Sequence, residues 1–114
     1  MNKRRSERQP VKIFVDHILG EDERCLCVSE DLSAGGIKLS GLPGPGWGRP
    51  RHVWLQFRLP DAHDSTVRAL GELRYERASA DGTRTRGYRF KYMSPRERCT
   101  FNEFLETQTT AATH

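Results

Sequence analysis

The amino-acid sequence predicts a mainly β fold, a small six-stranded antiparallel β-barrel followed by a C-terminal α-helix. Apolar and polar residues alternate in about six short segments, which is the pattern of half-buried strands. Turn-forming residues separate these segments, and a helix start followed by an apolar stripe occurs only near the end of the chain. Closing six such strands into a barrel would leave no exposed sheet edge, with the helix covering one opening.

The length of 114 residues fits one domain, and 35% of the residues are hydrophobic. We predict a flexible basic N-terminal arm over 1–10, the barrel and helix over 11–106, and a disordered tail over 107–114. No apolar run approaches the roughly 20 residues that a membrane-spanning helix needs. The basic start is not followed by the apolar core of a signal peptide, so we predict a cytoplasmic protein.

The first half of the chain contains three predicted strands. Alternation begins at Val11 and continues through Ile13 and Val15. A second strand covers residues 24–29, and Asp31-Leu32-Ser33-Ala34-Gly35-Gly36 then interrupts the pattern before it resumes at Ile37. This interruption predicts a hairpin whose tip or bulge is formed by residues 31–36.

The second half contains three more strands and the helix. Residues 41–50 form a loop with four glycines and three prolines, in which Trp47 is the large apolar residue. The later predicted strands are 53–59, 67–75 and 88–92, with an Asp-Gly hairpin turn at 80–83. Ser94-Pro95-Arg96-Glu97 predicts a capped helix start, and Phe101, Phe104 and Leu105 then share one helical face.

The cysteines and histidines indicate neither a metal site nor an enzyme. The three cysteines are an odd number, and Cys25-Leu26-Cys27 would put two thiols on one face of a strand. Their spacing is not that of structural zinc, so we expect reduced, partly buried thiols and no metal. The scattered histidines suggest no nucleophile–base pair, and no phosphate-binding glycine loop opens a helix. We therefore predict no catalytic residues, no cofactor and no enzymatic activity.

The net charge of +4 comes from the N-terminus alone, because residues 1–12 carry five cations against Glu7 and the remainder is balanced. Attraction for an anion is therefore concentrated in the arm, mainly in Arg4-Arg5-Ser6-Glu7-Arg8. Taken alone, this cluster could be a solvated tail, and the Asp31–Gly36 segment could be an ordinary turn. Arginine pairs with phosphate and with guanine O6 and N7, and it also stacks on bases.

Together the two segments resemble the PilZ domain family of bacterial second-messenger proteins, whose motifs are R-x-x-x-R before the first strand and [DN]-x-S-x-x-G about twenty residues later. Arg4 and Arg8 match the first motif, and Asp31, Ser33 and Gly36 match the second in full. The strands that begin at Gly71 and Gly87 are similar to strands of the family as well. The resemblance covers roughly residues 4–106.

The resemblance implies that this chain binds cyclic dimeric GMP (cyclic di-GMP) through these residues. Asp31 would accept hydrogen bonds from guanine N1–H and N2–H, and Ser33 would donate or accept nearby. Gly36, beside Gly35, would permit a positive φ or a close approach of the backbone to the ligand. Arg5 either assists with phosphate or is simply solvated.

Flat side chains on the later strands, aromatic or guanidinium, are further candidates. Related domains place a flat side chain against a guanine face, and Arg74 or Tyr75 is the best placed here. Sharing a face with Val67, Ala69 and Leu73 would instead make Tyr75 a core residue. Trp54 alternates against the apolar set, so it either contacts a partner or is covered by the arm or the helix.

The predicted function is a cyclic di-GMP receptor and adaptor, in which the ligand orders the arm and a downstream partner protein reads the change. Because the chain carries no output module, we expect it to act through that partner, without membrane insertion. The first alternative is a PilZ-like adaptor that works only through protein contacts. The second is a nucleic-acid-binding barrel, which the balanced charge outside the arm disfavours.

Overall fold

The computed structural model describes residues 9–44, 47–60 and 64–112. Its elements in chain order are β1 (Phe14–Ile18), β2 (Arg24–Ser33), β3 (Gly36–Leu42), β4 (His52–Arg58), β5 (Thr66–Ala78), β6 (Arg84–Met93) and α1 (Pro95–Ala112). The strands pair antiparallel in the order β1-β2-β3-β6-β5-β4, and β1 also pairs with β4, which closes the barrel. The predicted fold class is thereby confirmed.

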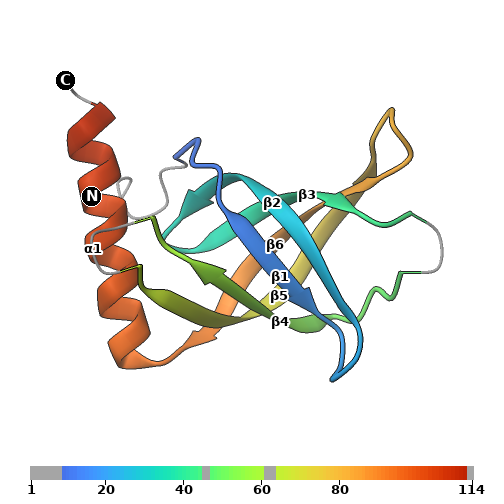
Figure 1. Ribbon diagram of the computed structural model, residues 1–114, viewed down its shortest axis with the longest axis horizontal. Coiled ribbons are helices and arrows are strands. Elements are labelled where there is room, and N and C mark those ends of the chain that lie inside the picture. Colours follow the sequence, from blue (N-terminus) through green and yellow to red (C-terminus); the bar gives the residue numbers. More distant parts are fainter. Residues whose placement is uncertain (1–8, 45–46, 61–63, 113–114) are drawn as a thin grey trace.

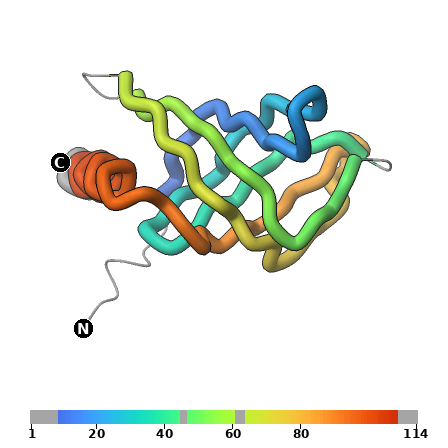
Figure 2. Tube along the Cα trace, turned by 90° about the horizontal axis from the view of Figure 1, so that it is seen from below, coloured from blue at the N-terminus to red at the C-terminus, as the bar shows by residue number. Residues whose placement is uncertain are grey.

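The helix lies across one end of the barrel (Figure 1). In Figure 2 the helix is seen end-on, beside the opening at that end. Phe101 projects from α1 into the barrel, where its ring meets Phe57 and Phe90 edge-on, with centroids 5.6 and 5.5 Å away. These aromatic rings form a close-packed apolar end, which we call the aromatic end.

The start of α1 agrees with the predicted cap. The amide of Glu97 donates to Ser94 Oγ at 3.2 Å, and Ser94 Oγ donates to Glu97 Oε1 at 2.8 Å. The helix continues to Ala112, six residues past the end at 106 that the sequence suggests. The apolar stripe stops at Leu105, so hydrophobic periodicity cannot predict how far the helix continues beyond that residue.

The opposite end of the barrel is filled by polar side chains, and we call it the polar end. His17 is fully buried and lies between Tyr88 Oη, 2.6 Å from Nε2, and Trp47 Nε1, which donates to Nδ1 at 3.2 Å. The buried Arg86 donates to Glu76 Oε2 at 2.7 Å, to Tyr88 Oη at 3.2 Å and to the Gly48 carbonyl at 2.9 Å. The loop before β4 is thus tied to the barrel interior.

Alternation along the strands otherwise distributes side chains as predicted. Val53, Leu55 and Phe57 of β4 are buried, whereas Trp54 between them is 40% exposed. Cys27 is buried, Cys25 is half-buried and Cys99 is exposed, and all three are free thiols. Burial raises the pKa of the Cys27 thiol to about 12. Among the described residues, no helix is long and apolar enough to cross a membrane.

Four register shifts interrupt the strand pairing, and two of them affect candidate site residues. The β2–β3 register shifts between Ser29 and Asp31, so the predicted bulge is present at the start of the motif segment. The β5–β6 register shifts between Leu73 and Tyr75. The suggestion that Tyr75 belongs to the core is therefore wrong: the bulge reverses its face, and its side chain is 37% exposed.

Candidate ligand-binding site on the barrel wall

The motif segment forms a tight turn between β2 and β3. Ser33 is buried, and its hydroxyl oxygen accepts hydrogen bonds from the amides of Gly35 at 3.3 Å and Gly36 at 3.1 Å. The same hydroxyl is 3.4 Å from the Gly36 carbonyl, to which it donates. Ser33 thus shapes the turn from inside, a role that chain spacing alone did not indicate.

Gly36 is needed for packing against the neighbouring strand. A Cβ atom at this position would overlap the backbone carbonyl of Tyr88 on β6. Among the described residues, the glycines with positive φ are Gly41 and Gly82. Positive φ is therefore not the reason for glycine at position 36. Gly35 has open space around it, since no atom lies within 4 Å of a Cβ built there.

Two contacts from outside the hairpin hold the turn in place. The amide of Phe90 on β6 donates to the Gly35 carbonyl at 2.8 Å. Arg98 of α1 donates from its guanidinium to the Ala34 carbonyl at 2.6 Å. The helix is thus bonded to the motif turn. Arg98 was not among the residues predicted from the sequence, because no short-range pattern connects a helix cation with a turn 64 residues earlier.

The segment that precedes β1 pairs with the motif. Gln9 and Leu32 exchange two backbone hydrogen bonds, 2.7 and 2.8 Å long, and form an isolated antiparallel bridge. Gln9 follows Arg8 directly in the sequence. Arg4, Arg5 and Arg8 lie outside the described residues, so their predicted contacts remain predictions.

The outer wall beside the motif brings together candidates from four strands. Asp31 on β2 is opposite Lys38 on β3, Lys38 is opposite Gly87 on β6, and Gly87 is opposite Tyr75 on β5. The ring of Tyr75 lies directly over Gly87, because a Cβ there would overlap three ring carbons. The guanidinium of Arg77 is 5.2 Å from the centroid of the same ring. An aromatic surface thus lies on the same wall as Asp31.

The neighbouring row contains a cluster of cations around one carboxylate. Gly36 is opposite Arg89, and Arg89 is opposite Glu72. The buried carboxylate of Glu72 lies 3.1 Å from Arg89, 3.4 Å from Arg51 and 3.4 Å from Arg74. Burial alone would raise the pKa of Glu72, but the charges of Arg89, Lys91 and Arg51 outweigh it and hold this pKa below its ordinary value.

The structure therefore gathers five predicted site residues, Asp31, Ser33, Gly36, Arg74 and Tyr75, on the wall formed by β2, β3, β6 and β5. It adds two cations that were not predicted from the sequence, Lys38 and Arg89. Their signal in the sequence is only alternation along a strand, which does not distinguish them from other exposed cations. The wall offers carboxylate, guanidinium, ammonium and aromatic groups, which suit a ligand with bases and phosphates.

A closed six-stranded barrel with a terminal helix and a Ser-Gly turn between β2 and β3 defines a class of small β-barrel domains. The chain belongs to the PilZ domain family, whose model matches residues 2–107. No curated protein matches the sequence.

Among solved structures, the inhibitor of motility of Bacillus subtilis (MotI/DgrA) has the same fold. Its TM-score to this chain is 0.78 at 16% sequence identity. The match covers 97% of this chain and 53% of that chain, so the present sequence spans about half the length of MotI/DgrA.

Proposed function

We propose that this protein is a cyclic di-GMP receptor and adaptor, and that it has no enzymatic activity. The observation that carries the proposal is the pairing of Gln9 with Leu32 inside the motif. This pairing fixes the chain one residue after Arg8 against the segment that contains Asp31 and Ser33. Family membership and the matching motif residues support the same ligand.

The candidate site residues are chemically complementary to the groups of the ligand. The proposed role of Asp31 is to accept from the N1–H and N2–H groups of a guanine, while Tyr75 or Arg74 covers a base face. Arg4 and Arg8 bind guanine edges and phosphates, with Arg5 as an additional cation. Ser33, Gly35 and Gly36 keep the turn in the shape that this arrangement requires.

In the proposed mechanism the ligand orders the arm. Like charges in residues 1–8 repel one another, and the sequence of this segment has Met1 as its one apolar side chain. The phosphates and guanines of the ligand neutralise Arg4 and Arg8 and hold them against the wall. The arm then presents a new surface, which a downstream protein recognises.

Calorimetric titration with cyclic di-GMP, with GTP and cyclic GMP as controls, tests this function. We expect saturable binding of the dinucleotide alone. Arg8→Ala should weaken binding by at least about tenfold, because a charge-assisted hydrogen bond contributes about 1.5–3 kcal/mol. Arg24→Ala, an exposed arginine at the start of β2, is the matched control and should bind like the parent. Equal affinities for Arg8→Ala and the parent would overturn the assignment.

A further inference from the structure

A row of apolar side chains crosses the outside of the barrel on the wall away from the motif turn. Ile18 on β1 is opposite Trp54 on β4, Trp54 is opposite Leu70 on β5, and Leu70 is opposite Tyr92 on β6. Trp54 and Tyr92 are 40% and 55% exposed, and the other two are half-buried. We call these four residues the aromatic row.

The row is unusual for its position. The outward face of an antiparallel sheet is normally polar, because only the inner face is covered by the core. Exposed Trp and Tyr beside Arg are the residue types that dominate binding energy at protein interfaces. The guanidinium of Arg68 lies 6.0 Å from the Trp54 ring and donates to Gln56 Oε1 at 3.0 Å. A guanidinium that is itself hydrogen-bonded thus flanks one ring of the row.

The charges beside the row are mostly positive. Arg51, Arg74 and Arg89 surround Glu72, and each of these guanidinium side chains is more than half exposed while the carboxylate is buried beneath them. Lys91 is also exposed, next to Tyr92 on β6. A partner that meets this surface therefore meets cations, which favours an acidic partner.

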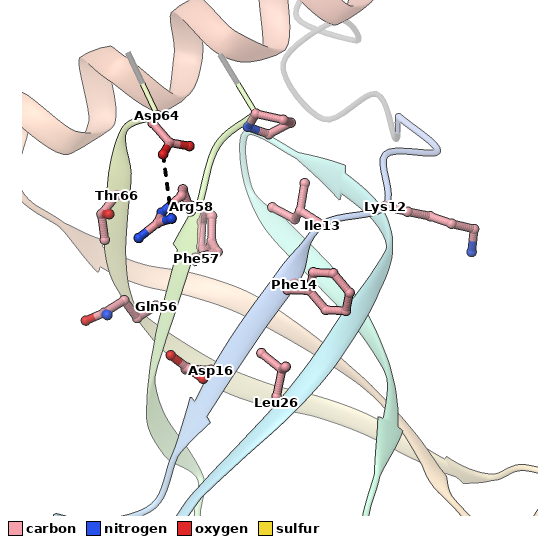
Figure 3. A pocket seen from close by; sticks show the side chains of 11 residues that line it. Lys12, Ile13, Phe14, Asp16, Leu26, Gln56, Phe57, Arg58, Asp64 and Thr66 are labelled. Atoms are coloured by element: carbon pink, nitrogen blue, oxygen red, sulfur yellow. Dashed lines mark ion pairs between the residues drawn. The ribbon is translucent and has the colours of Figure 1, made fainter. Parts of the chain in front are cut away.

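A second apolar spot on the barrel lacks this charge bias. Phe14 and Leu26 line a hollow of about 430 Å³ on the β1–β2–β4 face (Figure 3). Two cations and two anions line the same hollow: Lys12, Arg58, Asp16 and Asp64. Arg58 and Asp64 also pair with each other at 3.6 Å. The surface beside the aromatic row is therefore complementary to an acidic partner, whereas the charges of the hollow favour neither an acidic nor a basic one.

We propose that the aromatic row and its cationic rim, formed by Arg51, Arg74, Arg89 and Lys91, dock an acidic polypeptide segment that carries at least one aromatic or large aliphatic side chain. The inference rests on the proposed function for the existence of a protein partner, and it adds that partner's chemistry and contact surface. Arg89 connects the two regions, because it pairs with Gly36 in the motif row and with Glu72 in the rim. Arg74, a candidate contact of the ligand, also lies beside the row on Glu72, so a ligand on the motif wall and a segment on the row would share two arginines.

A displayed library of random peptides tests the surface whatever the identity of the partner. The full chain is the bait, and the double variant Trp54→Gln/Tyr92→Gln is used for counter-selection. We expect enriched peptides to combine Asp or Glu with aromatic or aliphatic residues, and to bind the double variant at least about tenfold more weakly. Phe14→Gln, an exposed aromatic in the hollow, should bind these peptides like the parent.

Charge reversal tests the rim separately. Lys91→Glu should weaken the enriched peptides several-fold, whereas Lys12→Glu beside the hollow should not. Three outcomes would overturn the proposal. The first two are no enrichment over the counter-selected pool and enrichment of basic peptides. The third is that Phe14→Gln weakens peptide binding as much as Trp54→Gln/Tyr92→Gln does. Stronger row-dependent binding to phosphatidylglycerol vesicles or to a single-stranded oligonucleotide would overturn it in favour of a membrane or a nucleic acid.

The two proposals fail separately. The selection is run without nucleotide, and the cyclic di-GMP titration is repeated on Trp54→Gln/Tyr92→Gln. If this variant binds the nucleotide normally but no acidic peptide is selected by the parent, only the docking surface is wrong. If acidic peptides are selected but no nucleotide binds, the receptor role is wrong and the docking surface stands.

Discussion

The two ends of the barrel interior are closed by different chemistry. At the aromatic end, Phe101 of α1 fills the opening by apolar packing against Phe57 and Phe90. At the polar end, Arg86 and His17 close the opening through directional hydrogen bonds to Glu76, Tyr88 and loop carbonyls.

The two ends therefore contribute differently: apolar packing mainly stabilises the fold, and the polar network mainly positions particular groups. Apolar packing is insensitive to pH and tolerates swaps of similar volume. A buried polar network is sensitive to the loss of any single member, because each group left behind is desolvated and unpaired. The polar end therefore holds Trp47 and Gly48 before β4, and the aromatic end attaches the helix next to the motif turn.

The largest expected effect is at the polar end. Arg86→Ala leaves the carboxylate of Glu76 without its buried partner, and it should lower the free energy of unfolding by about 3–5 kcal/mol. Arg49→Ala removes the exposed cation that lies 3.0 Å from the same carboxylate, and it should cost less than about 1 kcal/mol. Urea unfolding of both variants measures the contrast. Equal losses would show that the network does not depend on burial.

The ends should also differ in their response to acid. Burial, with the charge of Arg86, lowers the pKa of His17 from 6.5 to about 4. The folded state thus favours neutral His17, so this stabilisation is complete above pH 6.5 and is lost as the pH falls toward 4. The loss amounts to about 3 kcal/mol, at about 1.4 kcal/mol for each pKa unit.

His17→Gln isolates this contribution from that of the carboxylates. Unfolding free energies of parent and variant at pH 7 and pH 4.5 should show a smaller acid loss in the variant, by about 2–3 kcal/mol. The same acid loss in both proteins would mean that carboxylate protonation alone explains the pH dependence.

An intermediate effect is expected at the motif turn, which lies beside the aromatic end. Gly36→Ala forces the β6 backbone to move, and it should destabilise the protein by about 1–3 kcal/mol and weaken nucleotide binding. Gly35→Ala is the neighbouring control, since nothing occupies the space around its Cβ. Thermal unfolding and calorimetry of the pair test this, and a loss that is as large for Gly35→Ala would contradict the packing argument.

The smallest effect concerns the attachment of the helix. Ser94→Ala removes the cap of α1 and should cost about 1 kcal/mol. Thr100→Ala removes an exposed hydroxyl that donates within the helix to the Arg96 carbonyl, and it should change stability by less than about 0.5 kcal/mol. Denaturant midpoints distinguish the two. A cap effect at or below that of Thr100→Ala would show that packing of Phe101 alone fixes the helix.

The strands and the helix start could be predicted from local patterns. Alternation at Val53, Leu55 and Phe57 and the Ser94–Glu97 cap each depend on residues a few positions apart. The exposed face of Trp54 follows from the same alternation. The orientation of Tyr75 could not be predicted, because the bulge that reverses it arises from pairing with a strand about ten residues away.

By itself the sequence determined the order of the elements and the two motif segments, since these follow from short-range periodicity and from residue types at fixed spacing. It indicated the closed barrel less directly, because six short strands would otherwise leave sheet edges exposed. Only the tertiary structure decided that Arg98 holds the motif turn, that Arg86 and His17 fill the polar end, and that four strands align one apolar row. Each of these depends on the register between strands or on contacts between distant segments. Local periodicity predicts which face a residue occupies, but strand pairing decides which neighbours it has there.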